Sequence, residues 1–360
     1  MATTLNPQQR ALNFGAFTRQ HAQTLGALTG TANSHLEFEV PRVRLIQSIN
    51  LLVEVELEKG ETADNMTVME SMEFYNVIRR FAINYNNGFI PIVGDGKSLA
   101  VMNMIRLNPE VIIPTVKDLK EKSMFTIENA TYSRGSDDFV IEEGNIKYYF
   151  RLEIPLTLND RDPVGLVLAQ NKQTLINFNI DIADKVSMKS ISQHYPVKSV
   201  KITPEIVSFS VPEDANAFPD ISVIKTVDSR SEAFNEGNNI LRLGTGKIYR
   251  KIILYFEDEN GVPFTDEDIT SNIDFMFNTA DTPYSFNPKM LRLRNVSQLG
   301  YGLPEGYYAL DLSNAGIPNL GGSRDYIDTE LLTQFEVAFT ANKKGKITVI
   351  SEQLSRLRAQ

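Results

Sequence analysis

The segment Gly94-Asp95-Gly96-Lys97-Ser98 has the residue types of a phosphate-binding loop. A Walker-type loop requires a glycine five positions before the glycine of its Gly-Lys pair, because the backbone N–H groups of that loop surround the phosphates. In this sequence that position is Pro91. The segment therefore favours a helix cap over a nucleotide site, with its glycines forming the turn before a helix over 97–107.

Three clusters of carboxylates have the composition of a cation site or of an acid–base pair. Asp258-Glu259-Asn260-Gly261 and Asp266-Glu267-Asp268 lack the spacing and the terminal Glu of a calcium-binding EF-hand loop. Asp137-Asp138 and Glu142-Glu143 have the residue types of a glycosidase pair. The chain contains no Trp to stack on a sugar, however. We interpret all three clusters as solvated turns and loops.

The residue types used for nucleophilic and metal-assisted catalysis are scarce in this chain. It has no Cys and three His (His21, His35 and His194), and no two of the His lie at the short spacing of zinc ligands. No Ser lies in a nucleophile-elbow pattern. We therefore expect no enzyme, no catalytic residue, no metal site and no cofactor. The formal net charge of −9 also argues against direct sequence-specific binding of nucleic acid.

The elements that would position functional residues are β-strands, as the segment 147–184 shows. Both of its ends alternate apolar and polar residues, a period of two that predicts half-buried strands. The apolar positions are Tyr148, Phe150, Leu152 and Ile154 at one end and Ile176, Phe178, Ile180 and Ile182 at the other. Between them, Asp162-Pro163 resembles an N-cap followed by the first residue of a helix. Val164, Val167 and Leu168 follow at helical spacing, so the pattern predicts a short apolar helix that joins two strands.

The second half of the chain repeats this plan. A strand pattern over 306–312 is followed by a long connection over 313–332 and by a second strand pattern over 333–339. Connections of that length are usually functional or form an interface. The segment 212–219 is rich in proline and acidic residues, which is typical of a linker. The 360 residues therefore predict a pair of similar β-sandwiches.

The N-terminal segment 1–36 differs from the rest because it contains no Asp or Glu. Its apolar residues and one His recur at spacings of 3, 4, 4 and 3, which would line one face of a helix: Phe14, Phe17, His21, Leu25 and Leu28. One interpretation is a frayed polar tail. The other is an arm that becomes ordered on a neighbouring subunit or on an anionic membrane surface. The chain has no apolar run long enough to cross a membrane and no signal-peptide core, so we expect synthesis in a cytosol.

The segment 162–178 resembles a segment of tectivirus major capsid proteins, the shell proteins of tailless icosahedral phages with an internal membrane. The residues that carry the resemblance are Asp162-Pro163-Val164-Gly165-Leu166-Val167-Leu168-Ala169, Gln173, Leu175 and Phe178. Other similar segments follow in the order of the family, at 37–58, 76–85, 248–250, 303–308 and 335–337. The acidic charge balance and the lack of Cys and Trp fit the group that infects Gram-positive hosts.

The resemblance implies a mainly β fold of two tandem eight-stranded antiparallel jelly rolls, with short helices in the end connections. We accordingly expect an N-terminal arm (1–36), a first jelly roll (37–211), a linker (212–219), a second jelly roll (220–357) and a short tail (358–360).

The function that the resemblance implies is structural. Three chains would form a pseudo-hexagonal capsomer that tiles an icosahedral shell around an internal membrane. The protein would be made in the cytoplasm of a bacterial host and would reside in the virion capsid. Its partners would be further copies of itself, minor capsid, vertex or spike proteins, and the membrane surface. We expect assembly contacts at Asp162, Pro163, Leu166, Val167, Leu168, Ile317 and Leu320, and arm contacts at Arg10, Phe14, Phe17, Arg19, Leu25 and Leu28.

Two other functions compete with this interpretation. A tandem β-sandwich could bind a receptor or a carbohydrate, as a spike protein does, which would favour exposed aromatic residues and often a Ca²⁺ site. A β-sandwich hydrolase would require a pair of acid–base residues. The sequence provides clear evidence for neither.

Overall fold

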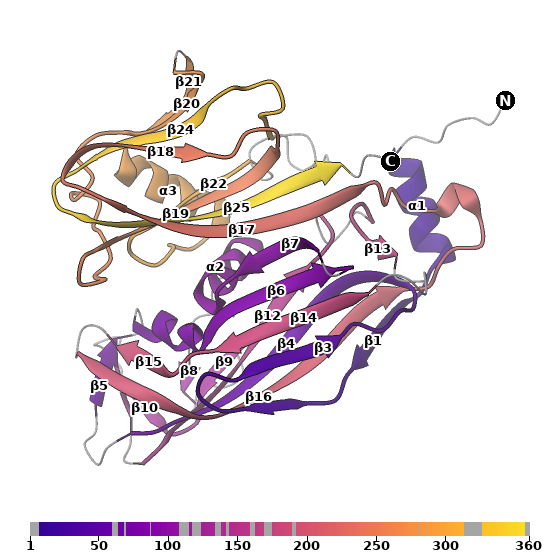
Figure 1. Cartoon of the computed structure of the whole chain (residues 1–360), viewed down its shortest axis with the longest axis horizontal. Helices are drawn as coiled ribbons and strands as arrows, with labels where there is room; N and C mark the ends of the chain where they lie inside the picture. The colour runs from indigo at the N-terminus through magenta and orange to yellow at the C-terminus, as the bar shows by residue number, and fades with distance from the viewer. Residues whose placement is uncertain are drawn as a thin grey trace.

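The chain forms two β-sandwiches that lie one on the other, with helix α2 between them (Figure 1). The computed structural model describes residues 7–59, 64–67, 70–86, 88–107, 115–116, 124–133, 138–141, 144–158, 163–168, 175–188, 192–279, 281–312 and 326–356.

The first sandwich consists of two facing antiparallel sheets. One sheet has the order β1 (Gln20–Thr24), β16 (Gln193–Phe209), β4 (Leu45–Leu57) and β12 (Ile146–Pro155). The other has the order β3 (His35–Glu39), β14 (Ile176–Ile182), β6 (Ile78–Tyr85) and β7 (Phe89–Gly94). Shorter strands add to this frame: β2 (Leu28–Gly30), β8 (Thr115–Val116), β9 (Phe125–Ile127), β13 (Val167–Leu168) and β15 (Lys185–Met188). A separate sheet contains β5 (Asp64–Thr67), β10 (Ala130–Ser133) and β11 (Asp138–Ile141).

The second sandwich repeats the same strand order. One sheet has the order β17 (Val223–Phe234), β25 (Gly345–Arg356), β19 (Ile248–Asp258) and β22 (Tyr307–Asp311). The other has the order β18 (Gly237–Leu243), β24 (Phe335–Ala341), β20 (Ile273–Phe277) and β21 (Asp281–Phe286). The short strand β23 (Ile327–Asp328) pairs with β19. In each half, the first and last strands are neighbours in one sheet, which is the jelly-roll arrangement. The predicted fold of two tandem eight-stranded jelly rolls is therefore confirmed.

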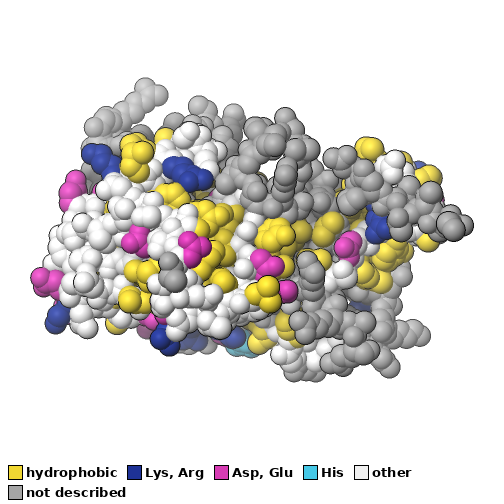
Figure 2. Space-filling view, turned by 90° about the horizontal axis from the view of Figure 1, so that it is seen from above, with side chains coloured by type: hydrophobic (Ala, Val, Ile, Leu, Met, Phe, Trp, Pro, Cys, Tyr) yellow, Lys and Arg dark blue, Asp and Glu magenta, His cyan; other side chains and the backbone are white. Residues whose placement is uncertain are grey.

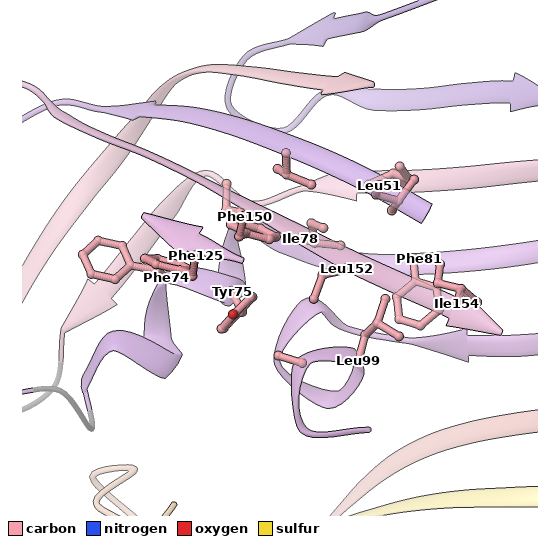
Figure 3. Packing of buried hydrophobic residues seen from close by; sticks show 14 of the residues in the cluster. Leu51, Phe74, Tyr75, Ile78, Phe81, Leu99, Phe125, Phe150, Leu152 and Ile154 are labelled. Carbon is pink, nitrogen blue, oxygen red and sulfur yellow. The ribbon is translucent and has the colours of Figure 1, made fainter. Parts of the chain in front are cut away.

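Alternating sequence produces the interior of the first jelly roll, as expected. Along β12 every second residue is buried, and these side chains meet the opposite sheet. Phe150 stacks on Phe125 with ring centroids 5.7 Å apart, and Tyr75 packs against Phe150 edge to face at 4.8 Å. Figure 3 shows these rings together with Leu99, which comes from α2. Helix α2 is thus part of the core and not an appendage.

Three α-helices and two short 3₁₀ segments lie among the described residues: α1 (Pro7–Phe17), α2 (Gly96–Arg106), α3 (Pro288–Leu299), η1 (Glu70–Val77) and η4 (Ala215–Ala217). The predicted helix over 97–107 is confirmed as α2. Its cap is Asp95, whose carboxylate accepts a hydrogen bond of 2.6 Å from the Ser98 N–H. The cap interpretation of the glycine-rich segment is therefore correct.

Helices α2 and α3 occupy the same place in the two jelly rolls and share a sequence pattern. Each follows the last strand of the second sheet of its jelly roll, β7 or β21, and comes before β12 or β22 in the chain. A Pro, an N-cap Asx, a Leu and an Asn recur at intervals of four residues in both halves: Pro91, Asp95, Leu99 and Asn103, then Pro283, Asn287, Leu291 and Asn295. The Leu is buried in both helices, and so is the Asn. This pattern identifies matching positions in the two halves.

The Asn of each pattern joins its helix by hydrogen bonds to β12 in the first half and to β22 in the second. Asn103 Nδ2 donates to the Glu153 carbonyl at 2.8 Å, and the Glu153 N–H donates to Asn103 Oδ1 at 2.9 Å. Asn295 makes the same two bonds with Ala309, at 2.7 and 3.0 Å. One carboxamide therefore satisfies both backbone groups of a strand residue, which buried strands require.

The two jelly rolls share a sheet and a core. Strand β7 pairs in parallel with β17 at Ile92 and Val227, so one sheet continues from the first jelly roll into the second. In the sheet β17-β25-β19-β22, strands β19 and β22 are buried on both faces. Its inner side chains, such as Leu254, belong to the core of the second jelly roll, and its outer ones, such as Ile253 and Ile350, belong to that of the first.

Two sequence predictions about local structure are wrong. The segment after Asp162-Pro163 is a turn followed by β13, not a helix, because Gly165 adopts a positive φ of 89° and Val167-Leu168 pairs with β4. The expected helical face of the N-terminal segment ends at Phe17. His21 lies in β1 and Leu28 in β2, and both strands pair with β16. The open edge of β16, far along the chain, outweighs the local helical periodicity.

Candidate assembly surfaces

The predicted assembly connection is packed against its own chain. Leu166 is buried in a small cluster with Phe14 and Leu45, while Val167 and Leu168 are half-buried beside β4. Pro163 is also half-buried. Asp162, Ile317 and Leu320 lie outside the described residues. Leu166 is thus covered within its own chain, and its predicted contact with a neighbouring subunit stays a prediction.

The predicted arm residues divide into two groups. Phe14 fixes α1 to the first jelly roll, with its ring 5.1 Å from that of Phe209 at 69°. Leu25 and Leu28 pack partly against the first core. Phe17 remains 60% exposed, and Leu12 is 73% exposed. Arg19 is exposed as well, and Arg10 is half-buried.

The junction between the jelly rolls is made by β7 and α2 on one side and by the outer face of β17-β25-β19-β22 on the other. Ser98 Oγ lies 3.1 Å from Ser229 Oγ of β17. Lys97 Nζ lies 2.6 Å from Glu73 Oε1 and 4.6 Å from the centre of the Tyr255 ring of β19. Its cation thus meets both a carboxylate of the first jelly roll and an aromatic face of the second.

Charged residues are buried at this junction and are paired. Lys225 Nζ lies 3.5 Å from Glu352 Oε2, and these side chains are 3% and 5% exposed. Lys251 Nζ lies 3.6 Å from Asp311 Oδ2 in the neighbouring part of the sheet. A small cavity of about 30 Å³, lined by Lys251 and Glu352 together with residues of α2, lies beside them. Its size suits a single water molecule.

Burial lowers the pKa of Lys225 to about 8, against the opposing effect of Glu352. Burial alone would raise the pKa of Glu352. The cations Lys225, Lys251 and Arg250 outweigh that effect, so the pKa of Glu352 is lowered. Both members of the pair are therefore ionised near neutral pH.

Helix α3 presents an exposed apolar face, in contrast with α2. Met290 is 65% and Leu293 51% exposed, and Val296 is also exposed. Their counterparts in α2, counted from the N-caps, are Ser98, Val101 and Met104, and all three are buried. The basic residues of α3 are Lys289, Arg292 and Arg294, and the helix contains no acidic residue.

In the first jelly roll, the sheet β1-β16-β4-β12 faces solvent. Its counterpart in the second jelly roll, β17-β25-β19-β22, is covered by the first. Leu52 is 40% exposed at the middle of β4. Around it lie exposed ion pairs, including Lys201 with Glu54 at 2.7 Å and Arg151 with Glu205 at 3.2 Å. Both helix α3 and this sheet are surfaces whose counterparts elsewhere in the chain are covered.

The acidic clusters of the second half are occupied by their own turns. Asp258 accepts hydrogen bonds from the N–H groups of Asn260 and Val262. Asp266 pairs with Arg292, and Asp268 pairs with Lys343 at 3.0 Å. Within the described part of the chain no group of three or more His, Asp or Glu has the arrangement of a metal site. Asp266 and Asp268 are only 12% and 14% exposed, so this cluster is ion-paired and not the solvated turn that the sequence indicates.

The view from the side of the second jelly roll shows apolar side chains in patches across the middle of the face, with acidic and basic side chains scattered among them (Figure 2). Exposed apolar residues of this jelly roll include Ile240 and Leu331 in addition to the α3 residues. No helix among the described residues is long and apolar enough to span a membrane.

Comparison with known proteins gives structural similarity without sequence similarity. No family model matches the sequence, and no curated protein matches it significantly. The fold is similar to that of the major capsid protein of STIV, Sulfolobus Turreted Icosahedral Virus, with a TM-score of 0.69 at 12% identity over 94% of this chain and 97% of that chain.

Two further capsid structures have the same fold over nearly the whole chain. The PBCV-1 virus capsid gives a TM-score of 0.62 at 8% identity, over 96% of this chain and 98% of that chain. The major capsid protein of Bacteriophage PM2 gives 0.54 at 8% identity, over 95% and 99%. At such identities the similarity establishes the fold, a double jelly roll.

The sequence contained one signal for the assembly surfaces that the alternation of strands did not reveal. The four-residue spacing of Pro, Asx, Leu and Asn occurs twice. It would have shown that α3 takes the same position in the second half as α2 takes in the first. The exposure of Met290 and Leu293 depends instead on which elements cover a helix, and no local pattern encodes that.

Proposed function

We propose that this chain is the major capsid protein of a tailless, membrane-containing virus, similar to the tectiviruses of Gram-positive hosts. Three chains would form a pseudo-hexagonal capsomer, and capsomers would tile an icosahedral shell. The protein would be made in the cytoplasm of a bacterial host, would reside in the virion, and would have a structural and not an enzymatic role.

The observation that carries this proposal is the union of two jelly rolls into one block through the β7–β17 pairing and a shared core. A protein that only presents binding loops does not require its two domains to be fused over a whole sheet face. A building block does, because its shape must stay constant in every copy. The similarity to three viral capsid structures over at least 94% of the chain supports the same conclusion.

Helix α1 suits a position on the inner side of the shell, against the internal membrane. Phe14 anchors the helix while Leu12 and Phe17 stay exposed. The helix contains a basic residue, Arg10, and no acidic one, and Arg19 follows it. Apolar side chains next to cations are the composition of a segment that binds an anionic membrane surface. The other partners of the proposal are neighbouring capsomers and minor capsid, vertex or spike proteins.

The mass of the purified protein in solution tests the capsomer. We expect a stable species of three chains of 40.5 kDa each by light scattering. A protein that stays monomeric at all concentrations and binds a glycan would contradict the proposal and favour the spike-like alternative.

A double variant, Leu12→Asp with Phe17→Asp, tests the position of α1. We expect an intact trimer that binds vesicles of anionic lipid more weakly than the unmodified protein. Leu331→Asp, at a residue 95% exposed in the second jelly roll, is the control and should bind normally. Normal vesicle binding with impaired shell assembly would instead assign this helix to contacts between capsomers.

A further inference from the structure

The junction inside the chain has a donor side and a receiving sheet. The donor side is the edge strand β7 with helix α2 of the first jelly roll. The receiving sheet is β17-β25-β19-β22 of the second, with β17 at its edge. The second jelly roll has its own donor side, β21 with α3, and the first has its own receiving sheet, β1-β16-β4-β12. Among the described strands, β21 and β1 each end a sheet without a further neighbour.

The Asn pattern sets the register between the two receiving sheets. Asn103 binds Glu153, and the pairing across the first sheet then runs through Asn50 and Glu205 to Thr24. Asn295 binds Ala309, and the pairing across the second sheet runs through Ile253 and Ile350 to Ser229. Thr24 of β1 therefore corresponds to Ser229 of β17. Two residues away, Ala22 corresponds to Val227, and on β4 Leu52 corresponds to Tyr255.

The same spacing relates the donor sides. Counted from the N-caps Asp95 and Asn287, Tyr284 corresponds to Ile92, Lys289 to Lys97 and Met290 to Ser98. Three of the contacts between the jelly rolls inside the chain are Ile92 with Val227, Ser98 with Ser229 and Lys97 with Tyr255. Each contact thus has a matching pair of exposed or half-exposed positions, one on the donor side of the second jelly roll and one on the receiving sheet of the first.

We infer that a second copy of this chain occupies these surfaces, so that β21 and α3 of one copy dock on β1-β16-β4-β12 of the next as β7 and α2 dock within the chain. Strand β21 then pairs in parallel with β1, with Tyr284 opposite Ala22. Met290 lies on Thr24, and Lys289 lies beside Leu52. This inference identifies the surfaces through which neighbouring chains meet in the capsomer, and it rests on the proposed function.

The chemistry of the two surfaces suits this contact. Docking covers Met290 and Leu293 on one copy and Leu52 on the other, which are among the exposed large apolar side chains of the chain. Helix α3 carries three basic residues and no acidic one, and the sheet presents Glu54 and Glu205, which pair there with Lys201 and Arg151. The contact is heterologous, so successive copies close into a ring when the rotation permits. It also covers both open strand edges.

Engineered cysteines test the register, because the chain has no Cys of its own. We expect Ala22→Cys with Tyr284→Cys in one chain to give disulfide-linked dimers and trimers on a denaturing gel after mild oxidation. A mixture of the two single variants should give dimers only. Ile240→Cys on β18, at the opposite edge of the sheet from β21, replaces Tyr284→Cys in the control and should give no links.

A second variant tests the helix face without cysteine chemistry. Met290→Glu with Leu293→Glu changes two exposed side chains, so we expect an unchanged circular dichroism spectrum and a monomer by light scattering. The inference is overturned if the Met290→Glu, Leu293→Glu protein is still a trimer and the Ala22→Cys, Tyr284→Cys protein forms no disulfide link. The proposal of a trimeric capsomer would then still stand. An unmodified protein that is monomeric at all concentrations would overturn both.

Discussion

Replacement of Lys225 by Met tests whether the buried pair at the jelly-roll junction is held together by charge. The variant leaves Glu352 buried at 5% exposure without the cation that lies 3.5 Å away. Removal of one partner of a buried pair costs about 3–5 kcal/mol. We expect about 3 kcal/mol, the lower end of that range, because Lys251 and Arg250 also lower the pKa of Glu352.

Thermal unfolding followed by circular dichroism measures this loss. A chain of 360 residues that unfolds as one unit has an unfolding entropy of about 0.75 kcal/mol per kelvin, so the expected loss lowers Tm by about 4 °C. Arg42→Met is the control. Its partner Glu39 is closer, at 2.6 Å, but the two side chains are 39% and 49% exposed. Solvent screens that pair, and its loss should cost less than about 1 kcal/mol.

The double variant Lys225→Met with Glu352→Leu removes both charges and fills the space with apolar groups. We expect it to regain most of the lost stability, since two matched apolar residues often replace a buried ion pair without cost. The reasoning is refuted if the single variant is as mild as Arg42→Met, or if the double variant loses the sum of the two single losses.

Three further outcomes follow from the structure. Leu166→Asp should lower the Tm of the isolated chain by placing an unpaired charge in the cluster around Phe14; an unchanged Tm together with loss of the trimer would return this residue to the subunit interface. Asn295→Leu should destabilise the protein by about 2–4 kcal/mol, because it leaves the N–H and C=O of Ala309 without partners. Urea titration measures this loss, and a value below about 1 kcal/mol would contradict the role of Asn295. The cations Lys225, Lys251 and Arg250 lower the pKa of Glu352 in the folded chain, so the unfolded chain binds protons first and stability should fall as the pH drops below about 4.5, more steeply than in Glu352→Leu; parallel stability curves for the two proteins would contradict it.

The alternating strands and helix α2 could be predicted because their signals are local. Buried and exposed positions of β12 follow the period of two in its sequence, and Asp95 precedes α2 as an N-cap should. The segment after Pro163 also had local helix signals, and there the prediction failed. Gly165 and the pairing of Val167 with β4 decided the structure instead.

The strands near the N-terminus and the surfaces of assembly depend on distant partners. His21 has helical spacing to Phe17, but its strand pairs with Ser208 and its neighbours, almost two hundred residues away in the chain. Strand β19 is buried on both faces, and no periodicity in its sequence tells a strand of one sandwich from a strand shared by two cores. The burial of Leu166 under Phe14 could not be predicted for the same reason.

The shared core has a consequence for how the chain folds as it is synthesised. Domains of a multidomain protein generally fold one after another from the N-terminus while the ribosome still translates the rest. Here the core around Phe150 also contains Ile253, Tyr307 and Ile350. The first jelly roll therefore has an apolar face that stays open until almost the last strand has left the ribosome. The nascent chain needs protection from aggregation from the time the first jelly roll is made until translation is nearly complete, and the two halves reach their final structure together.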